Sequence, residues 1–267
     1  MPTITAPDGC RIAFDVAGAG DALLLIPGLG GAAEFWEPIV PFLAKRNRVV
    51  AMDHRGAGRS DRPLATYSIE QIATDAVRLM DVLGIGRAHV SGHSTGGVIA
   101  QTLALDHPGR VGCLVISGSW AQFDARMALL FQARAEVLEC AGPKVYQRLT
   151  HALGFPAAWI EGHGAQLEAA VAAAEVNLAP LEVTLERIRM LARTDRSKEL
   201  AGIAAPTLII GAPDDPMVPF YQSEQLAAAI PGARLERIAG SHFFPRVRPD
   251  RFATIVGDFL EENDGPR

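Results

Sequence analysis

A serine in a sharp turn is the first candidate for chemistry. Residues 92–96 read Gly-His-Ser-Thr-Gly, between an apolar run that ends at Ser91 and a helical pattern that stops before Pro108. In a strand, turn and helix of this G-x-S-x-G type, the turn pushes the serine hydroxyl out over the sheet, and a Cβ on either glycine would collide with the strand or the helix. We therefore predict that Ser94 is a nucleophile, against the alternative of an idle serine in a glycine-rich turn.

A serine hydroxyl is too weakly acidic to attack alone, so it needs a base. Among the seven histidines, His242 follows an extended run over residues 233–238 and precedes the last helical pattern. This places it in a loop at the carboxyl end of the last strand, where open parallel sheets bind their ligands. The other six lie beside the serine, in a strand, at a helix end, in a charged loop or in a helical segment (His93, His89, His107, His54, His151 and His163). The sequence predicts His242 as the general base, with a structural histidine as the alternative.

The third group should be a carboxylate that fixes the imidazole tautomer and stabilises the imidazolium. Asp214 and Asp215 both qualify, because they directly follow an apolar strand pattern over residues 206–211. The chain order serine, aspartate, histidine is the order that α/β-hydrolases use. At least one of the two aspartates must be an ordinary turn residue.

A glycine-rich loop at residues 27–31 follows the first buried strand, so its backbone N–H groups can approach a ligand closely. We predict an oxyanion hole formed by the amides of Leu29 and Thr95, the latter at the start of a helix. A dinucleotide site is the rival interpretation, since Gly-x-Gly-x-x-Ala at residues 28–33 is followed by Asp53 at the end of the next strand. That rival leaves Ser94 and His242 unexplained.

Short apolar runs alternate with longer helical patterns, which predicts a parallel sheet covered by helices on both faces. A Ser-x-x-Gln capping box at residues 68–71 starts one of these helices, which ends at Gly84, and another runs over 249–260. The expected strands are 22–26, 48–52, 87–91, 111–117 and 206–211.

The alternation stops over residues 119–200, where the pattern is helical with breaks at Pro143 and Pro156. We predict that this segment is a helical cap inserted in a core formed by residues 1–118 and 201–267. Its aromatic residues Trp120, Phe123 and Phe131 would line an apolar substrate chamber above Ser94. The alternative is that these aromatic side chains only pack in the interior of the protein and do not contact a substrate.

Composition excludes several functional classes. The hydrophobic fraction is 49%, and 25 basic against 30 acidic residues give a net charge of −5, which offers no footprint for nucleic acid or an anionic membrane. No CxxC or HExxH pattern is present, and no apolar stretch reaches the roughly 20 residues of a membrane span. We expect a cytoplasmic protein that binds a small-molecule substrate and has no nucleic acid or membrane partner. A homodimer is possible from the sequence alone.

Five motifs together resemble the α/β-hydrolase superfamily. They are Ile-Pro-Gly-Leu-Gly-Gly at 26–31, Met-Asp-His-Arg-Gly-Ala-Gly-Arg-Ser at 52–60, Tyr-Ser-Ile at 67–69, Gly-His-Ser-Thr-Gly-Gly at 92–97 and Gly-Ser-His-Phe at 240–243. The resemblance implies a mostly parallel sheet of the eight-strand type, with antiparallel first strands and a helical cap after the sixth strand. Residues 67–71 and 105–108 are similar to 3-oxoadipate enol-lactonases and to aminoacrylate or carbamate hydrolases.

The same resemblance bears on the choice between the two aspartates. Counting forward from Gly211 favours Asp214, whereas counting back from Pro219 favours Asp215. We predict Asp215, because Pro216 and Pro219 rigidify the segment after the acid and fix where its side chain points.

The predicted reaction is hydrolysis of a small ester, lactone or activated amide through an acyl-Ser94 intermediate, with no metal or organic cofactor. A serine at the turn argues against families that use a carboxylate nucleophile. A ligand receptor, a C–C hydrolase or a perhydrolase on the same scaffold remain alternatives, followed by an NAD-binding oxidoreductase.

Overall fold

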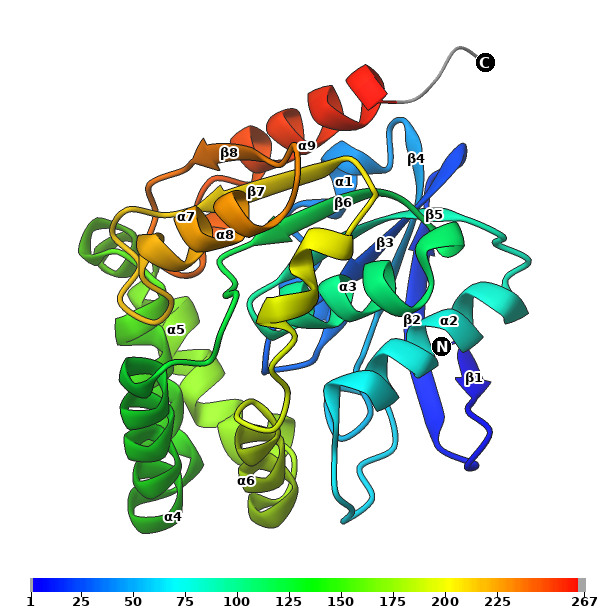
Figure 1. The fold of residues 1–267 in the computed structure, drawn as a ribbon. Coiled ribbons are helices and arrows are strands. Elements are labelled where there is room, and N and C mark those ends of the chain that lie inside the picture. The colour runs from blue at the N-terminus through cyan, green and yellow to red at the C-terminus, as the bar shows by residue number, and fades with distance from the viewer. Residues whose placement is uncertain (1, 264–267) are drawn as a thin grey trace.

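An eight-stranded sheet forms the centre of the molecule (Figure 1). The computed structural model describes residues 2–263, so Met1 and the last four residues of the expected core segment 201–267 lie outside the described residues. The strand order is β1-β2-β4-β3-β5-β6-β7-β8. The strands are β1 (Thr3–Thr5), β2 (Arg11–Ala17), β3 (Asp21–Ile26), β4 (Asn47–Met52), β5 (Ala88–His93), β6 (Val111–Ser117), β7 (Thr207–Gly211) and β8 (Arg234–Arg237).

Strand β2 runs antiparallel to both of its neighbours, β1 and β4, and all the other pairings are parallel. The predicted mostly parallel sheet of the eight-strand type with antiparallel first strands is therefore confirmed. The helices are α1 (Val40–Leu43), α2 (Ile69–Val82), α3 (Thr95–Asp106), α4 (Ala125–Gly154), α5 (Ala157–Asn177), α6 (Leu181–Met190), α7 (Phe220–Ala229), α8 (Phe244–Val247) and α9 (Pro249–Asn263), with short 3-10 helices at Ala33–Trp36, Pro108–Arg110 and Ser197–Gly202.

The alternation of side chains along each strand divides the core into two layers. In β3, Leu23 and Leu25 belong to one buried cluster, and Leu24 and Ile26 belong to the other. The first cluster includes residues of α1 and α9, and the second includes residues of α2, α3 and α7. Because successive side chains of a strand point to opposite faces, a strand between two helical layers must be apolar at every position.

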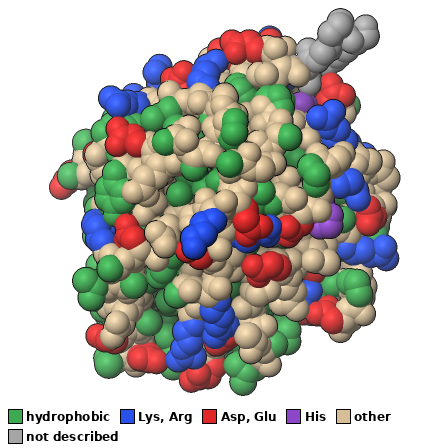
Figure 2. Space-filling model, in the orientation of Figure 1, with side chains coloured by type: hydrophobic (Ala, Val, Ile, Leu, Met, Phe, Trp, Pro, Cys, Tyr) green, Lys and Arg blue, Asp and Glu red, His purple; other side chains and the backbone are tan. Residues whose placement is uncertain are grey.

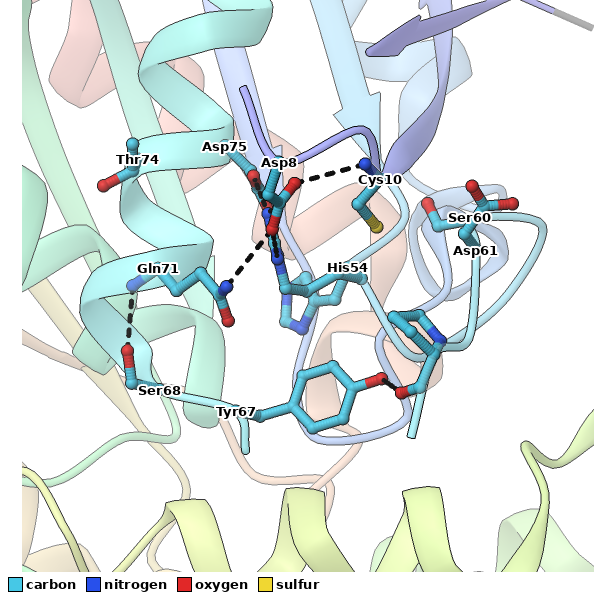
Figure 3. Close-up of polar contacts among 12 residues, drawn as sticks. Asp8, Cys10, His54, Ser60, Asp61, Tyr67, Ser68, Gln71, Thr74 and Asp75 are labelled. Carbon is cyan, nitrogen blue, oxygen red and sulfur yellow. Dashed lines mark hydrogen bonds and ion pairs between the residues drawn. The ribbon is translucent and has the colours of Figure 1, made fainter. Parts of the chain in front are cut away.

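Helix α2 is fixed at its start by a side-chain cap. The Ser68 hydroxyl accepts a hydrogen bond from the Gln71 backbone N–H at 3.1 Å, which is the serine half of the predicted capping box. The Gln71 amide also reaches Asp8, which accepts a bond from the Cys10 N–H (Figure 3). These contacts tie the turn between β1 and β2 to the start of α2.

Three helices, α4, α5 and α6, follow β6 in the chain and precede β7. They project from one end of the sheet (Figure 1). Gly142 has a φ of 79° and kinks α4 immediately before Pro143, and Pro156 directly precedes α5. The proline breaks read from the sequence are therefore real breaks in helix geometry. Acidic and basic side chains are interspersed on the face seen in Figure 2. Within residues 2–263, no helix has the length and apolar character to cross a membrane.

Candidate active site

Ser94 alone makes the turn between β5 and α3. Strand β5 ends at His93 and α3 begins at Thr95, and Ser94 adopts φ 55° and ψ −121°. Such a backbone is strained for a residue with a side chain and persists only where its surroundings hold it. A Cβ on Gly92 would lie 2.1 Å from the Gly96 carbonyl oxygen, so only glycine fits there. A Cβ on Gly96 would likewise lie 2.1 Å from the Ile26 carbonyl oxygen, so both glycines of the motif are required by steric contacts, as predicted.

The structure brings three polar side chains from distant parts of the chain into one line. The Nε2 atom of His242 lies 3.1 Å from the Ser94 Oγ, and its Nδ1 atom lies 2.7 Å from the Asp215 Oδ2. All three residues are buried, with exposed fractions of 5% for Ser94, 3% for His242 and 6% for Asp215. A serine, an imidazole and a carboxylate in this order can transfer the hydroxyl proton to the imidazole while the carboxylate holds the tautomer.

The two neighbouring aspartates have different partners. The second oxygen of Asp215 accepts the backbone N–H groups of Met217 at 2.8 Å and Val218 at 2.9 Å. The carboxylate of Asp214 instead accepts the N–H groups of Gly240 at 3.1 Å and Ser241 at 3.0 Å. Asp215 therefore contacts the imidazole, whereas Asp214 fixes the loop that carries it.

The glycine-rich loop after β3 lies against the serine. A Cβ on Gly28 would be 3.1 Å from the Ser94 Cβ, and the Gly31 N–H donates to the Gly28 carbonyl at 2.9 Å, which turns the loop. Thr95 is the first residue of α3, so its N–H has no acceptor within the helix. Both amides predicted to bind an oxyanion, those of Leu29 and Thr95, thus belong to segments next to Ser94.

Arg187 of α6 supports this loop from the other side. Its guanidinium donates to the carbonyls of Leu29 at 2.8 Å and Arg55 at 2.5 Å, and lies 3.2 Å from the Nδ1 of His54. Burial lowers the pKa of Arg187 to about 10 and, with the nearby cation, lowers the pKa of His54 well below its ordinary value. His54 is therefore a neutral acceptor at this position.

His93 is buried beside the reacting groups but has a structural setting. Its ring stacks on Phe35 with centroids 4.7 Å apart, and its Nδ1 lies 3.1 Å from the Ser117 hydroxyl. Burial, reinforced by His242 at a ring separation of 5.0 Å, lowers the pKa of His93 well below its ordinary value. This neutral ring packs under the imidazole of His242.

A cavity of about 520 Å³ opens at Ser94 and His242 and extends under α4, α5 and α6. Phe131 lines it, but Trp120 and Phe123 do not, which corrects our expectation for those two residues. Phe123 precedes the start of α4 at Ala125, so it does not lie on the helical face that the spacing assumed. Trp120 is 2% exposed and packs in the core with its ring centroid 6.0 Å from that of Phe123.

Other lining residues were not found from the sequence. At the junction of α4 and α5, Phe155 and Trp159 stack with centroids 3.9 Å apart and face the cavity. Three arginines also line it: Arg134, Arg187 and Arg246. A signal for Arg134 does exist, because it lies four residues before Leu138 and three after Phe131 on the buried stripe of α4.

The structure also bears on the dinucleotide interpretation. Asp53 is 1% exposed, and its carboxylate accepts the N–H of Ala33 at 2.7 Å and pairs with Arg59 at 2.7 Å. This carboxylate holds the two loops together and does not face an open site, so it is unsuited to bind a ribose. Among residues 2–263, no cluster of three or more histidine, cysteine, aspartate or glutamate side chains is arranged to hold a metal.

Comparison with known proteins agrees with this geometry. The model of the alpha/beta hydrolase fold family matches residues 21–245. The protein named carbamate hydrolase RutD of Azorhizobium caulinodans is 38% identical over 252 residues, which cover 94% of this chain and 95% of the relative.

Two solved structures are similar over nearly the whole chain. The enol-lactonase from Burkholderia xenovorans superposes with a TM-score of 0.89 at 28% identity, covering 97% of this chain and 100% of the other. Est816, described as an N-acyl homoserine lactone degrading enzyme, superposes with a TM-score of 0.82 at 28% identity, with the same coverage. The superfamily resemblance inferred from the sequence motifs is confirmed: this chain is a hydrolase and belongs to the alpha/beta hydrolase fold family.

Proposed function

We propose that the protein is a serine hydrolase that cleaves a small ester, lactone or activated amide through an acyl intermediate on Ser94. The observation that carries this proposal is the line of hydrogen bonds from Ser94 through His242 to Asp215, with Ser94 and His242 in the lining of a cavity of about 520 Å³. The strained turn exposes the hydroxyl to that cavity, which a structural serine would not require.

In the proposed first step, the Ser94 Oγ attacks the substrate carbonyl while His242 Nε2 takes the hydroxyl proton. Asp215 stabilises the imidazolium, and the N–H groups of Leu29 and Thr95 bind the oxyanion of the tetrahedral intermediate. His242 then gives its proton to the leaving group, and the acyl group stays on Ser94. A water molecule, deprotonated by His242, releases the acid and restores the hydroxyl. The nucleophile, the base, the acid and the oxyanion donors of this cycle all belong to the chain, so the proposed mechanism requires no cofactor.

The relatives and the cavity favour a compact acyl substrate. The names of the similar proteins refer to a carbamate, an enol-lactone and an acyl homoserine lactone. All three compounds contain a carbonyl group that carries an oxygen or nitrogen substituent, as the proposed acyl transfer requires. A cavity of about 520 Å³ holds a molecule of small-metabolite to drug size.

The test is covalent labelling of the protein by a fluorophosphonate, combined with turnover of p-nitrophenyl esters and a panel of small lactones and carbamates. We expect the label on the peptide that contains Ser94 and many turnovers per protein, with Ser94→Ala losing both. Ser91→Ala is the matched control, because it removes a buried hydroxyl of β5, the strand before Ser94, and this hydroxyl has no hydrogen-bond partner among residues 2–263. Absence of labelling, or ester turnover that persists in Ser94→Ala, would overturn the proposal, and binding without repeated turnover would favour a receptor.

A further inference from the structure

The loop that carries His242 has an unusual backbone. Ser241, the residue before this histidine, has a φ of 57°, and Gly240 has a φ of 151°. A positive φ is uncommon for a residue other than glycine, and it persists only where the surrounding contacts enforce it. The contacts that hold this loop therefore also determine where the imidazole of His242 lies.

The core holds one side of the loop. The carboxylate of Asp214, which follows β7 in the chain, accepts the N–H groups of Gly240 and Ser241. This contact fixes the start of the loop next to the end of the sheet. The hydroxyl of Ser241 and the backbone N–H of Phe243 are not bound by Asp214, and these two donors flank His242 in the chain.

The acceptors for both donors belong to the end of α4. The Ser241 hydroxyl donates to the Leu153 carbonyl at 3.1 Å, and the Phe243 N–H donates to the Gly154 carbonyl at 2.8 Å. Leu153 and Gly154 are the last two residues of α4, and the last carbonyls of a helix have no partner within it. The loop of His242 therefore completes the end of a helix that precedes β7.

The ring of Phe243 packs against the same helix end. Its centroid lies 5.0 Å from that of Phe155, the residue after α4, with the two rings edge to face. A Cβ on Gly154 would lie 2.2 Å from Cε2 of the Phe243 ring, so only glycine lets helix and loop approach this closely. These interactions between residues 153–155 and 241–243 form what we call the α4–loop contact.

We infer that the end of α4 is a positioning element for His242, and that Ser241 is a positioning residue of the triad. The inference rests on the proposed function, and it adds a dependence of the chemistry on the position of α4. His242 must lie within hydrogen-bond distance of Ser94 and Asp215 at the same time. A misplacement of about 1 Å can lower a rate about 100-fold, so a shift of α4 passed on through the contact would slow the reaction.

The first test removes the hydroxyl of Ser241. Ser241→Ala keeps a Cβ, and so the same backbone strain, and it keeps both N–H groups that Asp214 accepts. We expect kcat for a p-nitrophenyl ester, per active site titrated with a fluorophosphonate, to fall about tenfold. KM should change by less than about twofold, because Ser241 does not line the cavity. A purely structural role would lower the melting temperature and leave kcat per titrated site unchanged.

Thr194→Val is the matched control for the loss of a hydroxyl. The Thr194 hydroxyl donates at 3.1 Å to the Glu70 carboxylate on α2, and this bond involves neither the loop of His242 nor the end of α4. We expect its kcat per titrated site to stay within about twofold of the wild type. An equal loss of kcat in Thr194→Val, or an unchanged kcat in Ser241→Ala, would refute the positioning role.

Gly154→Ala disrupts the same contact from the side of the helix, because the added Cβ displaces the ring of Phe243. We expect kcat to fall about 100-fold, and the double variant with Ser241→Ala to lose less than the product of the two single effects. Gly162→Ala in α5 is the control, since its Cβ would meet nothing within 4 Å in the described part of the chain. Independent, fully multiplicative losses in the double variant would contradict a shared contact.

A measurement that needs no turnover separates this inference from the proposed function. The buried proton between His242 Nδ1 and Asp215 Oδ2 can be followed by NMR, and its exchange with water reports how firmly the ring is held. We expect exchange about tenfold faster in Ser241→Ala than in the wild type and in Thr194→Val. That result supports the positioning role even if no ester is cleaved. Equal exchange in all three proteins overturns the role even if esters are cleaved.

Discussion

The exchange of one carboxylate oxygen for an amide nitrogen at Asp215 is the sharpest probe of the proposed mechanism. In Asp215→Asn, the side-chain oxygen can still accept the N–H groups of Met217 and Val218, which keeps the segment in place. The amide nitrogen then points at His242 Nδ1 in place of the Asp215 Oδ2, which is 2.7 Å away. An amide N–H can only donate to Nδ1, so the ring proton must move to Nε2, the atom that faces the Ser94 hydroxyl.

A protonated Nε2 cannot accept the proton of Ser94, so the variant should fold normally and fail in chemistry. The same exchange in a serine protease lowers kcat by about 10⁴, or roughly 5.5 kcal/mol of transition-state stabilisation. We expect a loss of that order here in kcat for a p-nitrophenyl ester. The melting temperature should change little, because the two backbone hydrogen bonds to Asp215 are retained.

Asp214→Asn provides the matched comparison on the neighbouring residue. Its two oxygens each accept one backbone N–H of the loop that carries His242, from Gly240 and Ser241. An amide there can accept only one of these, and because Asp214 is exposed, the loss of one hydrogen bond costs its net contribution of about 0.5–1.5 kcal/mol. We therefore expect Asp214→Asn to lower stability by about that amount and kcat by much less than Asp215→Asn. Steady-state kinetics and thermal unfolding of both variants decide this, and a larger kcat loss in Asp214→Asn would refute the assignment of roles.

Further predictions concern the cavity wall, the oxyanion loop and pH. Phe131→Ala should shift the chain-length preference toward larger acyl groups, whereas Phe123→Ala, which lies outside the cavity lining, should leave that preference unchanged in the same ester series. Arg187→Met removes the bond to the Leu29 carbonyl, so kcat for a neutral ester should fall about tenfold with a smaller change in KM, since the loop binds the transition state more than the substrate. The pKa of His93 is lowered in the folded protein, so the unfolded chain takes up more protons and stability should fall as pH drops below about 6.5, by up to about 1.4 kcal/mol per pH unit for this residue. The free energy of unfolding, measured with denaturant between pH 5 and 7, should change less with pH in His93→Gln than in the wild type. An equal pH dependence in the two proteins would contradict a buried neutral His93.

Much of the fold can be predicted from the sequence because its signals are local. The expected strand at 111–117 is β6 to the residue, and the capping box at Ser68 starts α2 as predicted. Strands β1 and β2 carry a weaker signal, since β1 has three residues and the buried run of β2 is only residues 12–14, between the charged residues Arg11 and Asp15. Their antiparallel arrangement followed only from the resemblance to a family, because the pairing of β2 with β4 depends on contacts distant in sequence.

The candidate site divides in the same way. The elbow around Ser94 is visible in the sequence as a short motif, although its two glycines have different causes: a Cβ on Gly92 would meet the carbonyl of Gly96, and a Cβ on Gly96 would meet the carbonyl of the distant Ile26. The aromatic prediction for α4 depended on where that helix begins, and a start at Ala125 instead of Phe123 excludes Phe123 from the lining. An error of two residues at a helix boundary is common. Here it is enough to assign Phe123 to the cavity lining when it lies outside the helix.

Arg134 shows what sequence periodicity could have contributed and where it ends. The buried positions of the first half of α4 are Met127, Phe131, Arg134 and Leu138, at intervals of four, three and four residues. An arginine at a core-facing interval of an apolar stripe indicates that its charge meets something inside the protein. The sequence does not reveal what that is, because Tyr146 and Thr150 reach the guanidinium only after Gly142 and Pro143 kink the helix. The kink thus brings two hydroxyl groups to a buried cation that the spacing of the first half of α4 would leave among apolar side chains.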